Sequence, residues 1–262
     1  MDLVRFPGLN IELNISKIAF ELFGIEIYFY AICIVLGISI ALILARLSKE
    51  KFGIKYEKII ETMIGAIAWG YIGARLYYVI FNLNDYIQNP LKILNIRDGG
   101  LAIYGGIIFA GLFIFIKCKK DKINFLDFCD YIIPFVSIAQ CIGRWGNFFN
   151  KEAYGYETMS GLRMGIYDYS GKYLEVHPTF LYESICNFII FIILSLISNK
   201  RKFKGQIIYT YFVLYGLVRF FIEELRLDSL MIGDYKISQI LSIILVIVFG
   251  IVLIYKRIKN KR

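Results

Sequence analysis

The sequence predicts an all-α fold: a polytopic membrane protein with seven transmembrane helices and a small extracytoplasmic head. The 262 residues are 58% hydrophobic and 17% aromatic, with a mean hydropathy of +0.61, whereas soluble domains are about 45–50% apolar. Only 4 prolines and 19% charged residues also argue against disorder. Because no linker or internal repeat divides the chain, we expect one integral membrane domain over residues 1–262.

Seven apolar runs are long enough to cross a bilayer, which takes about 20 residues of helix. They lie at 25–47, 59–81, 99–117, 125–146, 179–198, 206–224 and 237–255. The first and last are the most uniformly apolar, whereas the second, third, fourth and sixth carry charges or several glycines. The run 11–24 is too short and too polar to cross, so we interpret it as an amphipathic helix on the outer interface.

The basic residues are distributed unequally between the two sides of these spans. Of the 30 Lys and Arg, 18 lie in the segments 46–58, 117–122, 200–204 and 256–262. The segments on the opposite side hold nine, at 1–24, 82–98, 147–178 and 225–236. Because loops rich in Lys and Arg stay in the cytoplasm, we expect the N-terminus outside and the C-terminus in the cytoplasm. The long connection 147–178 is then the extracytoplasmic loop or head.

The composition excludes several classes of site. The 5 cysteines show no CxxC spacing and four lie within apolar runs, so neither a disulfide scaffold nor a zinc site is expected. With 1 histidine and no carboxylate cluster at ligand spacing, we expect no metal and no cofactor. The net charge of +9 is explained by cytoplasmic loops, so no nucleic-acid partner is expected.

Charged side chains within the spans are costly unless they face a cavity or a partner. Three arginines, Arg75, Arg144 and Arg219, lie toward the outer ends of different spans. They could converge on one anion, since a guanidinium offers a planar fork of donors suited to phosphate. Internal ion pairs or headgroup anchors are the alternative, and the candidate charges within spans also include the carboxylates of Glu61, Glu183 and Glu223.

The segment 143–155, GRWGNFFNKEAYG, ends the fourth span and enters the outer loop. It places a cation, two amides and a carboxylate at the interface: Arg144, Asn147, Asn150 and Glu152. Anchoring alone does not need so many polar groups, which favours a binding site. A glycine-broken helix end with capping amides is the structural alternative.

Three further segments combine polar residues with span ends. Residues 98–106, DGGLAIYGG, open the third span. Their glycines, among them Gly99, Gly100 and Gly105, expose backbone N–H groups that favour anions. Residues 177–183, HPTFLYE, hold the only histidine, His177, which is either a structural hydrogen-bonding group or a catalyst.

In the sixth span, polar residues recur on one helix face, which must therefore avoid lipid. They are Tyr215, Arg219, Glu223 and Arg226.

Together these segments resemble the prolipoprotein diacylglyceryl transferases of bacterial inner membranes. The resemblance extends from GARLYYVIF at 73–81 to SQILS at 238–242, and the 143–155 segment is similar to the family pattern GRxGNFxNxExxG. It implies transfer of a diacylglyceryl group from phosphatidylglycerol to the lipobox cysteine thiol of a preprolipoprotein. The products are a thioether and glycerol 1-phosphate.

The resemblance also implies site residues. Arg144 and Arg219 are expected to stabilise the leaving phosphate. Tyr104 and Tyr215 are further catalytic candidates, whereas Arg75 is expected to be structural or to support the residues that touch the substrate. The residues expected to bind phosphatidylglycerol are Arg144, Asn147, Asn150, Glu152, Gly99, Gly100, Gly105, Arg219 and Glu223.

The chain departs from the resemblance at Tyr104, where many members carry a histidine that has been proposed as a base. A phenol with a pKa of about 10 is a poor base at neutral pH, so Tyr104 is expected to donate a hydrogen bond. The acceptor of the thiol proton is left open between Glu152, His177 and the departing phosphate. A transporter or channel for an anionic or lipid substrate, and a membrane scaffold or receptor, remain the alternative classes of function.

Overall fold

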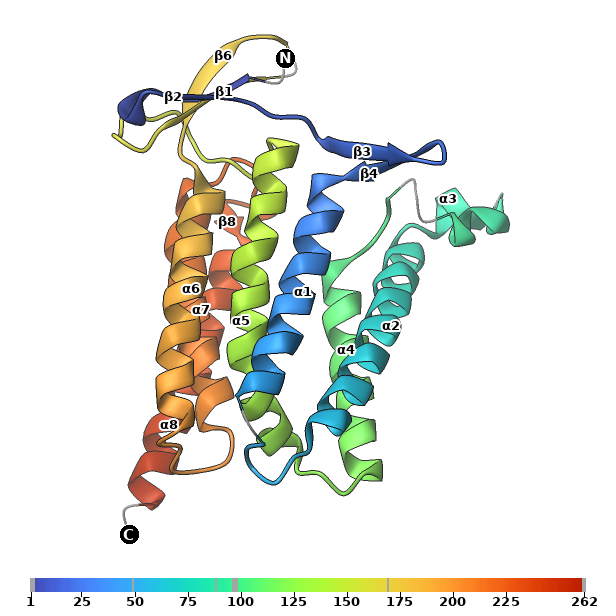
Figure 1. Ribbon diagram of the computed structural model, residues 1–262, viewed down its shortest axis with the longest axis vertical. Coiled ribbons are helices and arrows are strands. Elements are labelled where there is room, and N and C mark those ends of the chain that lie inside the picture. Colours follow the sequence, from blue (N-terminus) through green and yellow to red (C-terminus); the bar gives the residue numbers. More distant parts are fainter. Residues whose placement is uncertain (1–2, 49, 88, 96–98, 169, 261–262) are drawn as a thin grey trace. The chain divides into compact units, whose positions relative to one another are not determined.

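A computed structural model of the chain describes residues 3–48, 50–87, 89–95, 99–168 and 170–260 (Figure 1). Within these residues seven helices have 18 residues or more, and each overlaps one predicted span. They are α1 (Phe29–Leu47), α2 (Tyr56–Phe81), α4 (Ile103–Lys120), α5 (Phe125–Asn150), α6 (Thr179–Ser198), α7 (Gln206–Leu225) and α8 (Ile237–Lys259). Of the described helices, α1, α2, α5, α6 and α8 are long and apolar enough to cross a membrane. The protein is therefore mostly helical and has the character of a multi-pass membrane protein.

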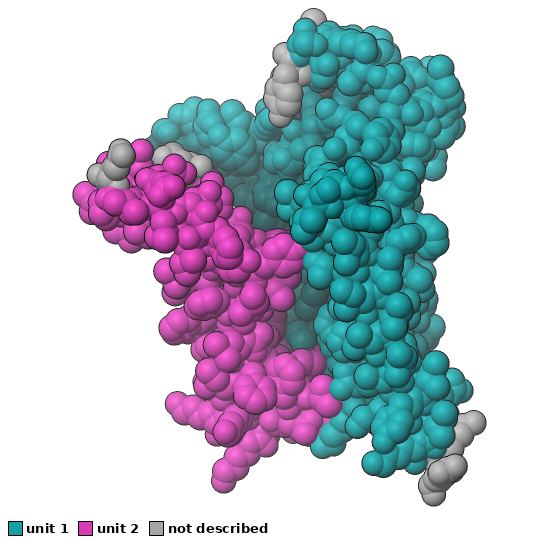
Figure 2. Space-filling model, turned by 180° about the vertical axis from the view of Figure 1, so that it is seen from behind, with its two compact units in different colours: residues 1–47, 130–262 teal, residues 48–129 magenta. Residues whose placement is uncertain are grey.

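The chain divides into two compact units, residues 1–47 with 130–262, and residues 48–129 (Figure 2). The smaller unit is built on α2 and α4, joined through the short helix α3 (Leu83–Ile87) and the 3-10 helix η2 (Pro90–Leu94). Glycines let the two long helices approach closely, since a Cβ at Gly105 would lie 2.4 Å from the Gly73 carbonyl oxygen. Small residues at such crossings are typical of helix pairs in membranes.

An ion-pair cluster lies at the other end of α2 and α4. Lys58 and Lys117 each contact both Glu61 and Asp121, at distances between 2.5 and 3.2 Å. The Glu61 side chain is 51% exposed. Glu61 therefore belongs to an exposed helix end and is not a charge buried within a span.

In the larger unit, α7 begins at a cap supplied by another helix. Asp130 of α5 is fully buried and accepts hydrogen bonds from the backbone N–H groups of Gly205, Ile207 and Ile208, at 2.7 to 3.0 Å. Its carboxylate also pairs with Arg201 at 3.0 Å. The first N–H groups of a helix have no partner within the helix, and a carboxylate suits their partial positive charge. This contact fixes where α7 starts relative to α5.

Beyond one end of α5 and α6 lies a four-stranded antiparallel sheet (Figure 1). Its order is β2 (Ile11–Asn14), β1 (Leu3–Phe6), β5 (Met164–Tyr167) and β6 (Tyr173–Val176), and the 3-10 helix η1 (Pro7–Leu9) joins β1 to β2. Two hairpins complete the strands: β3 (Ile18–Leu22) with β4 (Ile25–Tyr28), and β7 (Met231–Ile232) with β8 (Tyr235–Lys236).

The strands correct two predictions. The description all-α is wrong for the head, which is a sheet, and the interfacial helix predicted over 11–24 is wrong because these residues form β2 and β3. The apolar residues Ile18, Phe20 and Leu22 alternate with Ala19 and Glu21, a period of two that suits a strand. The first long helix accordingly begins at Phe29 rather than at 25.

A hydrophobic core joins the head to the helix ends. Its residues come from β1, from the position after β2, from β5 and β6, and from α5 and α6: Val4, Phe6, Ile15, Phe148, Met164, Ile166, Val176 and Phe180. Phe148 belongs to the last turn of α5, which continues to Asn150 and not only to the predicted end at 146. The head is therefore anchored by the same turn that carries the polar residues of the 143–155 segment.

Candidate active site

Glu183 is the centre of a buried charge cluster in the larger unit. It lies in the second turn of α6 and its side chain is 3% exposed. One carboxylate oxygen lies 2.5 Å from Nη2 of Arg144 on α5. The other lies 3.0 Å from Nη1 of Arg219 on α7 and 3.5 Å from Nη1 of Arg226. A single carboxylate thus draws together one arginine of α5, one of α7 and Arg226, the residue that directly follows α7.

Two further carboxylates hold Arg219 and Arg226. Glu223 is almost fully buried and lies 2.5 Å from Nη2 of Arg219, four residues earlier on the same helix. Asp228 accepts two hydrogen bonds from Arg226, at 2.9 and 2.7 Å. Burial raises the pKa of Asp228, but the hydrogen bonds and charge of Arg226 outweigh it, so this pKa lies below its usual range. With Asp228 included, three arginines face three carboxylates, so the charges of the cluster balance.

The polar residues of the 143–155 segment form a chain of contacts that starts at this cluster. Nη1 of Arg144 donates to Asn147 at 3.4 Å, and Nδ2 of Asn147 donates to Glu152 at 2.9 Å. Asn150 donates to the same Glu152 oxygen at 3.2 Å. The structure therefore brings together Arg144, Asn147, Asn150 and Glu152, and connects them through Glu183 to Arg219.

Backbone contacts fix the end of the segment against α7. Gly155 forms a bridge with Arg226, and the next residue, Tyr156, donates its N–H to the Leu225 carbonyl at 2.9 Å. A Cβ at Gly155 would lie 2.6 Å from that carbonyl oxygen and 2.8 Å from Cβ of His177. Only glycine fits this crossing, which holds the loop after α5 beside the arginine-bearing end of α7.

His177 takes part in the same crossing. Its backbone exchanges hydrogen bonds with Gly155 and Tyr156, and its Nδ1 lies 3.2 Å from the Tyr182 hydroxyl. These contacts give His177 a structural part in joining β6 to α6. Tyr215 stacks on Tyr211, whose hydroxyl donates to Gln140, four residues before Arg144.

Arg75 belongs to the smaller unit, and its guanidinium is fully engaged there. Nε donates to the Ile93 carbonyl, Nη1 to those of Gly99 and Gly100, and Nη2 to those of Lys92 and Asn95, at 2.7 to 3.0 Å. Since a guanidinium has five N–H donors, none is left for an anion. Arg75 therefore organises the connection between α2 and α4.

The other predicted residues of the smaller unit have mixed surroundings. Gly99 and Gly100 have φ of +82° and +79°, and their carbonyl oxygens, not their N–H groups, are the atoms that Arg75 contacts. Gly105 packs against Gly73 and Tyr77. Tyr104 is 39% exposed in the first turn of α4. Asp98, the first residue of the glycine-rich segment, lies outside the described residues.

A family comparison identifies the kind of protein to which this geometry belongs. A model of the prolipoprotein diacylglyceryl transferase family matches residues 17–255. The chain belongs to this family. The resemblance inferred from the sequence motifs is therefore confirmed.

Relatives are similar over almost their whole length. The phosphatidylglycerol–prolipoprotein diacylglyceryl transferase of Clostridium novyi (strain NT) is 46% identical over 253 residues, which cover 94% of this chain and 98% of the relative. The enzyme of the same name from Clostridioides difficile (strain 630) is 46% identical over 94% of this chain and 97% of its own. That of Enterococcus faecalis (strain ATCC 700802 / V583) is 40% identical over 93% and 91%. None of these names supports the transporter or channel alternative.

Within this family member, the sequence-based site left out two residues that the structure places at the centre. These are Glu183 and Arg226, which are charged residues of the sequence but are not among the predicted site residues. The available signal was the carboxylate of Glu183 within a strongly apolar span, because such a charge needs partners of opposite sign.

Proposed function

We propose that the protein transfers the diacylglyceryl group of phosphatidylglycerol to the lipobox cysteine thiol of a preprolipoprotein signal peptide. The observation that carries this proposal is the set of relatives so named, 40 to 46% identical over 93 to 94% of the chain. The thiol sulfur bonds to the carbon of the diacylated glycerol that bears the phosphate. The bond between that carbon and the phosphate oxygen breaks, and its electron pair leaves with glycerol 1-phosphate.

The arginine cluster supports a role in stabilising the leaving phosphate. Negative charge grows on the phosphate oxygens as the bond breaks, and fixed donors in a water-poor site are most effective there. Among the described residues, the contacts of Arg144 and Arg219 use two of the five N–H donors of each. Both guanidiniums can therefore bind an anion while Glu183 holds them in place, and Asn147, Asn150, Glu152 and Glu223 would position the headgroup.

The remaining roles are also proposals. Tyr215 lies one turn before Arg219 on α7 and is a candidate for contact with the substrate. Tyr104 would supply a hydrogen bond, and Gly99, Gly100 and Gly105 would shape the start of α4. The thiol proton passes to Glu152, to His177 or to the departing phosphate.

The charge distribution supports a topology for this reaction. We infer seven crossings of a bacterial cytoplasmic membrane, with the N-terminus and the head outside and the C-terminus in the cytoplasm. The arginine cluster lies at the head end of α5, α6 and α7, which would direct the reaction to the outer leaflet.

A direct assay tests the transfer. Purified protein in nanodiscs would be mixed with phosphatidylglycerol and a lipobox peptide, and the peptide mass and the released glycerol 1-phosphate would be measured. We expect the peptide to gain one diacylglyceryl group, one glycerol 1-phosphate to appear for each, and a peptide with Ser in place of the lipobox Cys to remain unchanged. Equal modification of the Ser peptide, or no modification of either, would contradict the proposal.

A further inference from the structure

We propose a second lipid site at the opposite end of the larger unit, where an anionic phospholipid of that leaflet binds through its phosphodiester group. The site is a pocket of about 320 Å³ between the ends of α6, α7 and α8. Its lining consists of Ile197, Lys202, Phe203, Gln206, Thr210, Leu253, Ile254 and Arg257. At about 30 Å³ for each water, its volume is that of about ten water molecules, enough for a phosphate and part of a glycerol.

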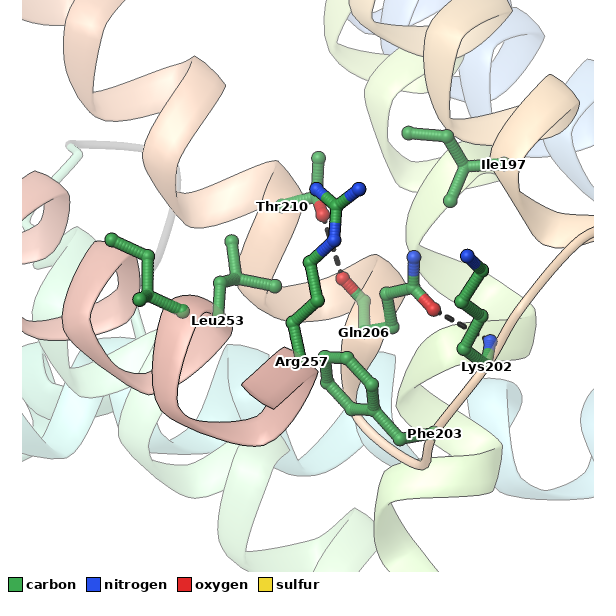
Figure 3. A pocket seen from close by; sticks show the side chains of 8 residues that line it. Ile197, Lys202, Phe203, Gln206, Thr210, Leu253 and Arg257 are labelled. Atoms are coloured by element: carbon green, nitrogen blue, oxygen red, sulfur yellow. Dashed lines mark hydrogen bonds between the residues drawn. The ribbon is translucent and has the colours of Figure 1, made fainter. Parts of the chain in front are cut away.

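The orientation of Gln206 supplies a donor to this pocket. The backbone N–H of Lys202 donates to Oε1 of Gln206 at 2.6 Å. Because that N–H can bond only to the oxygen, the amide is oriented with Nε2 free to donate. Figure 3 shows this nitrogen and the side-chain nitrogens of Lys202 and Arg257 extending in the same general direction.

Two cations accompany this amide, and within the described part of the chain neither forms an ion pair. Lys202 and Arg257 both line the pocket, and the described residues hold no carboxylate in ion-pair contact with either of them. The neighbouring segments 199–206 and 253–260 contain no Asp or Glu at all. The Thr210 hydroxyl donates to the Gln206 carbonyl at 2.7 Å and so is not counted as a donor to the ligand. The pocket thus presents two charges and one amide donor to an anion.

The rest of the lining favours a lipid over a free anion. Phe203, Leu253 and Ile197 form apolar walls, and Ile254 is 63% exposed beside them. Basic pockets between transmembrane helices, next to apolar surface, suit anionic phospholipid headgroups. This site lies at the start of α7, whereas the arginine cluster lies at its end, so it does not depend on the proposed transfer reaction.

The test uses the full-length protein in detergent, with lipid binding followed by native mass spectrometry. The probe is phosphatidylinositol, which carries an anionic phosphodiester and is not the proposed substrate. Gln206→Glu keeps the acceptor for the Lys202 N–H but replaces the Nε2 donor with an anionic oxygen. Arg257→Ala removes one cation. Lys259→Ala is the matched control, since it removes the same charge from the same helix turn outside the pocket.

We expect the Kd of the most tightly bound phosphatidylinositol molecule to rise about tenfold in Gln206→Glu and in Arg257→Ala. In Lys259→Ala it should stay within about twofold of the unmodified protein's value. Phosphatidylcholine, whose phosphodiester is neutralised by choline, should bind equally weakly to all. Because the variants lie on different helices, the loss of one through misfolding leaves the other to decide. Equal loss in Lys259→Ala, no loss in either pocket variant, or displacement of the lipid by inorganic phosphate would overturn the proposal.

Discussion

Arg144 and Arg75 show how the partners of a residue decide its role. Both are arginines in long helices, but Arg75 donates all five N–H groups to backbone carbonyls. Arg144 contacts a carboxylate and an amide, and these contacts leave other N–H donors of its guanidinium for a ligand. Of these two arginines, Arg144 is therefore the one equipped to bind an incoming phosphate.

Replacing Arg144 should affect turnover more than folding. We expect Arg144→Ala to lower kcat about 100- to 1000-fold, the usual loss when a donor to a developing oxyanion is removed. Arg144→Lys should restore little, because an ammonium lacks the planar five-donor fork with which a guanidinium can hold Glu183 and a phosphate together. Peptide modification at saturating phosphatidylglycerol measures the effect, with thermal unfolding in detergent as the control. Near-normal turnover in Arg144→Lys would show that only the charge at this position matters.

Tyr104 is expected to tolerate loss of its hydroxyl. If it supplies only a hydrogen bond, Tyr104→Phe removes about 0.5–1.5 kcal/mol, which is at most about a tenfold loss of rate. The same peptide assay, run across a pH series, measures this. A loss of about 1000-fold with folding intact would instead assign the hydroxyl to proton transfer.

For single residues, the sequence predicts which charged side chains matter. It predicts less well which of them pair with each other. Arg144, Asn147, Asn150 and Glu152 lie close together in one segment, so their grouping could be anticipated. The position of Glu183 between arginines of α5 and α7 could not, because it depends on how three helices pack. The partners of Arg75 are backbone carbonyls. Because every residue has one, the sequence does not show which of them Arg75 contacts.

Gly155 should be the least replaceable glycine of the loop after α5. In Gly155→Ala the new Cβ would be forced against the Leu225 carbonyl and His177, a clash expected to cost about 1–3 kcal/mol. Gly161→Ala is the control, because nothing lies within 4 Å of its added Cβ. Thermal unfolding in detergent should show a lower Tm only for Gly155→Ala, and equal Tm values would contradict the packing argument.

Asp130 should control the start of α7. We expect Asp130→Ala to lower the free energy of unfolding by about 2 kcal/mol or more, since it removes a helix cap and one buried ion pair, that with Arg201. Asp130→Asn keeps one acceptor oxygen and should lose less. Hydrogen exchange of residues 205–210 would report the fraying directly, and unchanged protection in Asp130→Ala would disprove the capping role.

Long helices were easier to predict than short strands. The seven long helices overlap apolar runs visible in the sequence, although several ends shifted by a few residues. Residues 11–22 were misread because four- and five-residue strands offer only two or three apolar positions, too few to separate a period of two from a helical stripe. The cap at Asp130 was missed because a carboxylate within an apolar run gives no sign of which helix it caps.

The orientation of the whole molecule can be tested by labelling. In a cysteine-free background, Met159→Cys would report on the head and Lys200→Cys on the basic end. Met159 is 88% exposed, and Lys200 is also exposed, so each should react wherever reagent has access. We expect a membrane-impermeant maleimide to label Met159→Cys in intact cells and Lys200→Cys only after permeabilisation. The reverse pattern would invert the proposed topology.

The pairing of β1 with β5 sets an order of events during synthesis. Arg5 lies opposite Gly165, and α1, α2, α4 and α5 are made between them. At about 5–20 residues per second, the first strand waits on the order of 10 to 30 s for its neighbour. During that time Val4 and Phe6 lack the core that Met164, Ile166 and Val176 later provide. The residues that leave the ribosome first are thus among the last to reach their final contacts.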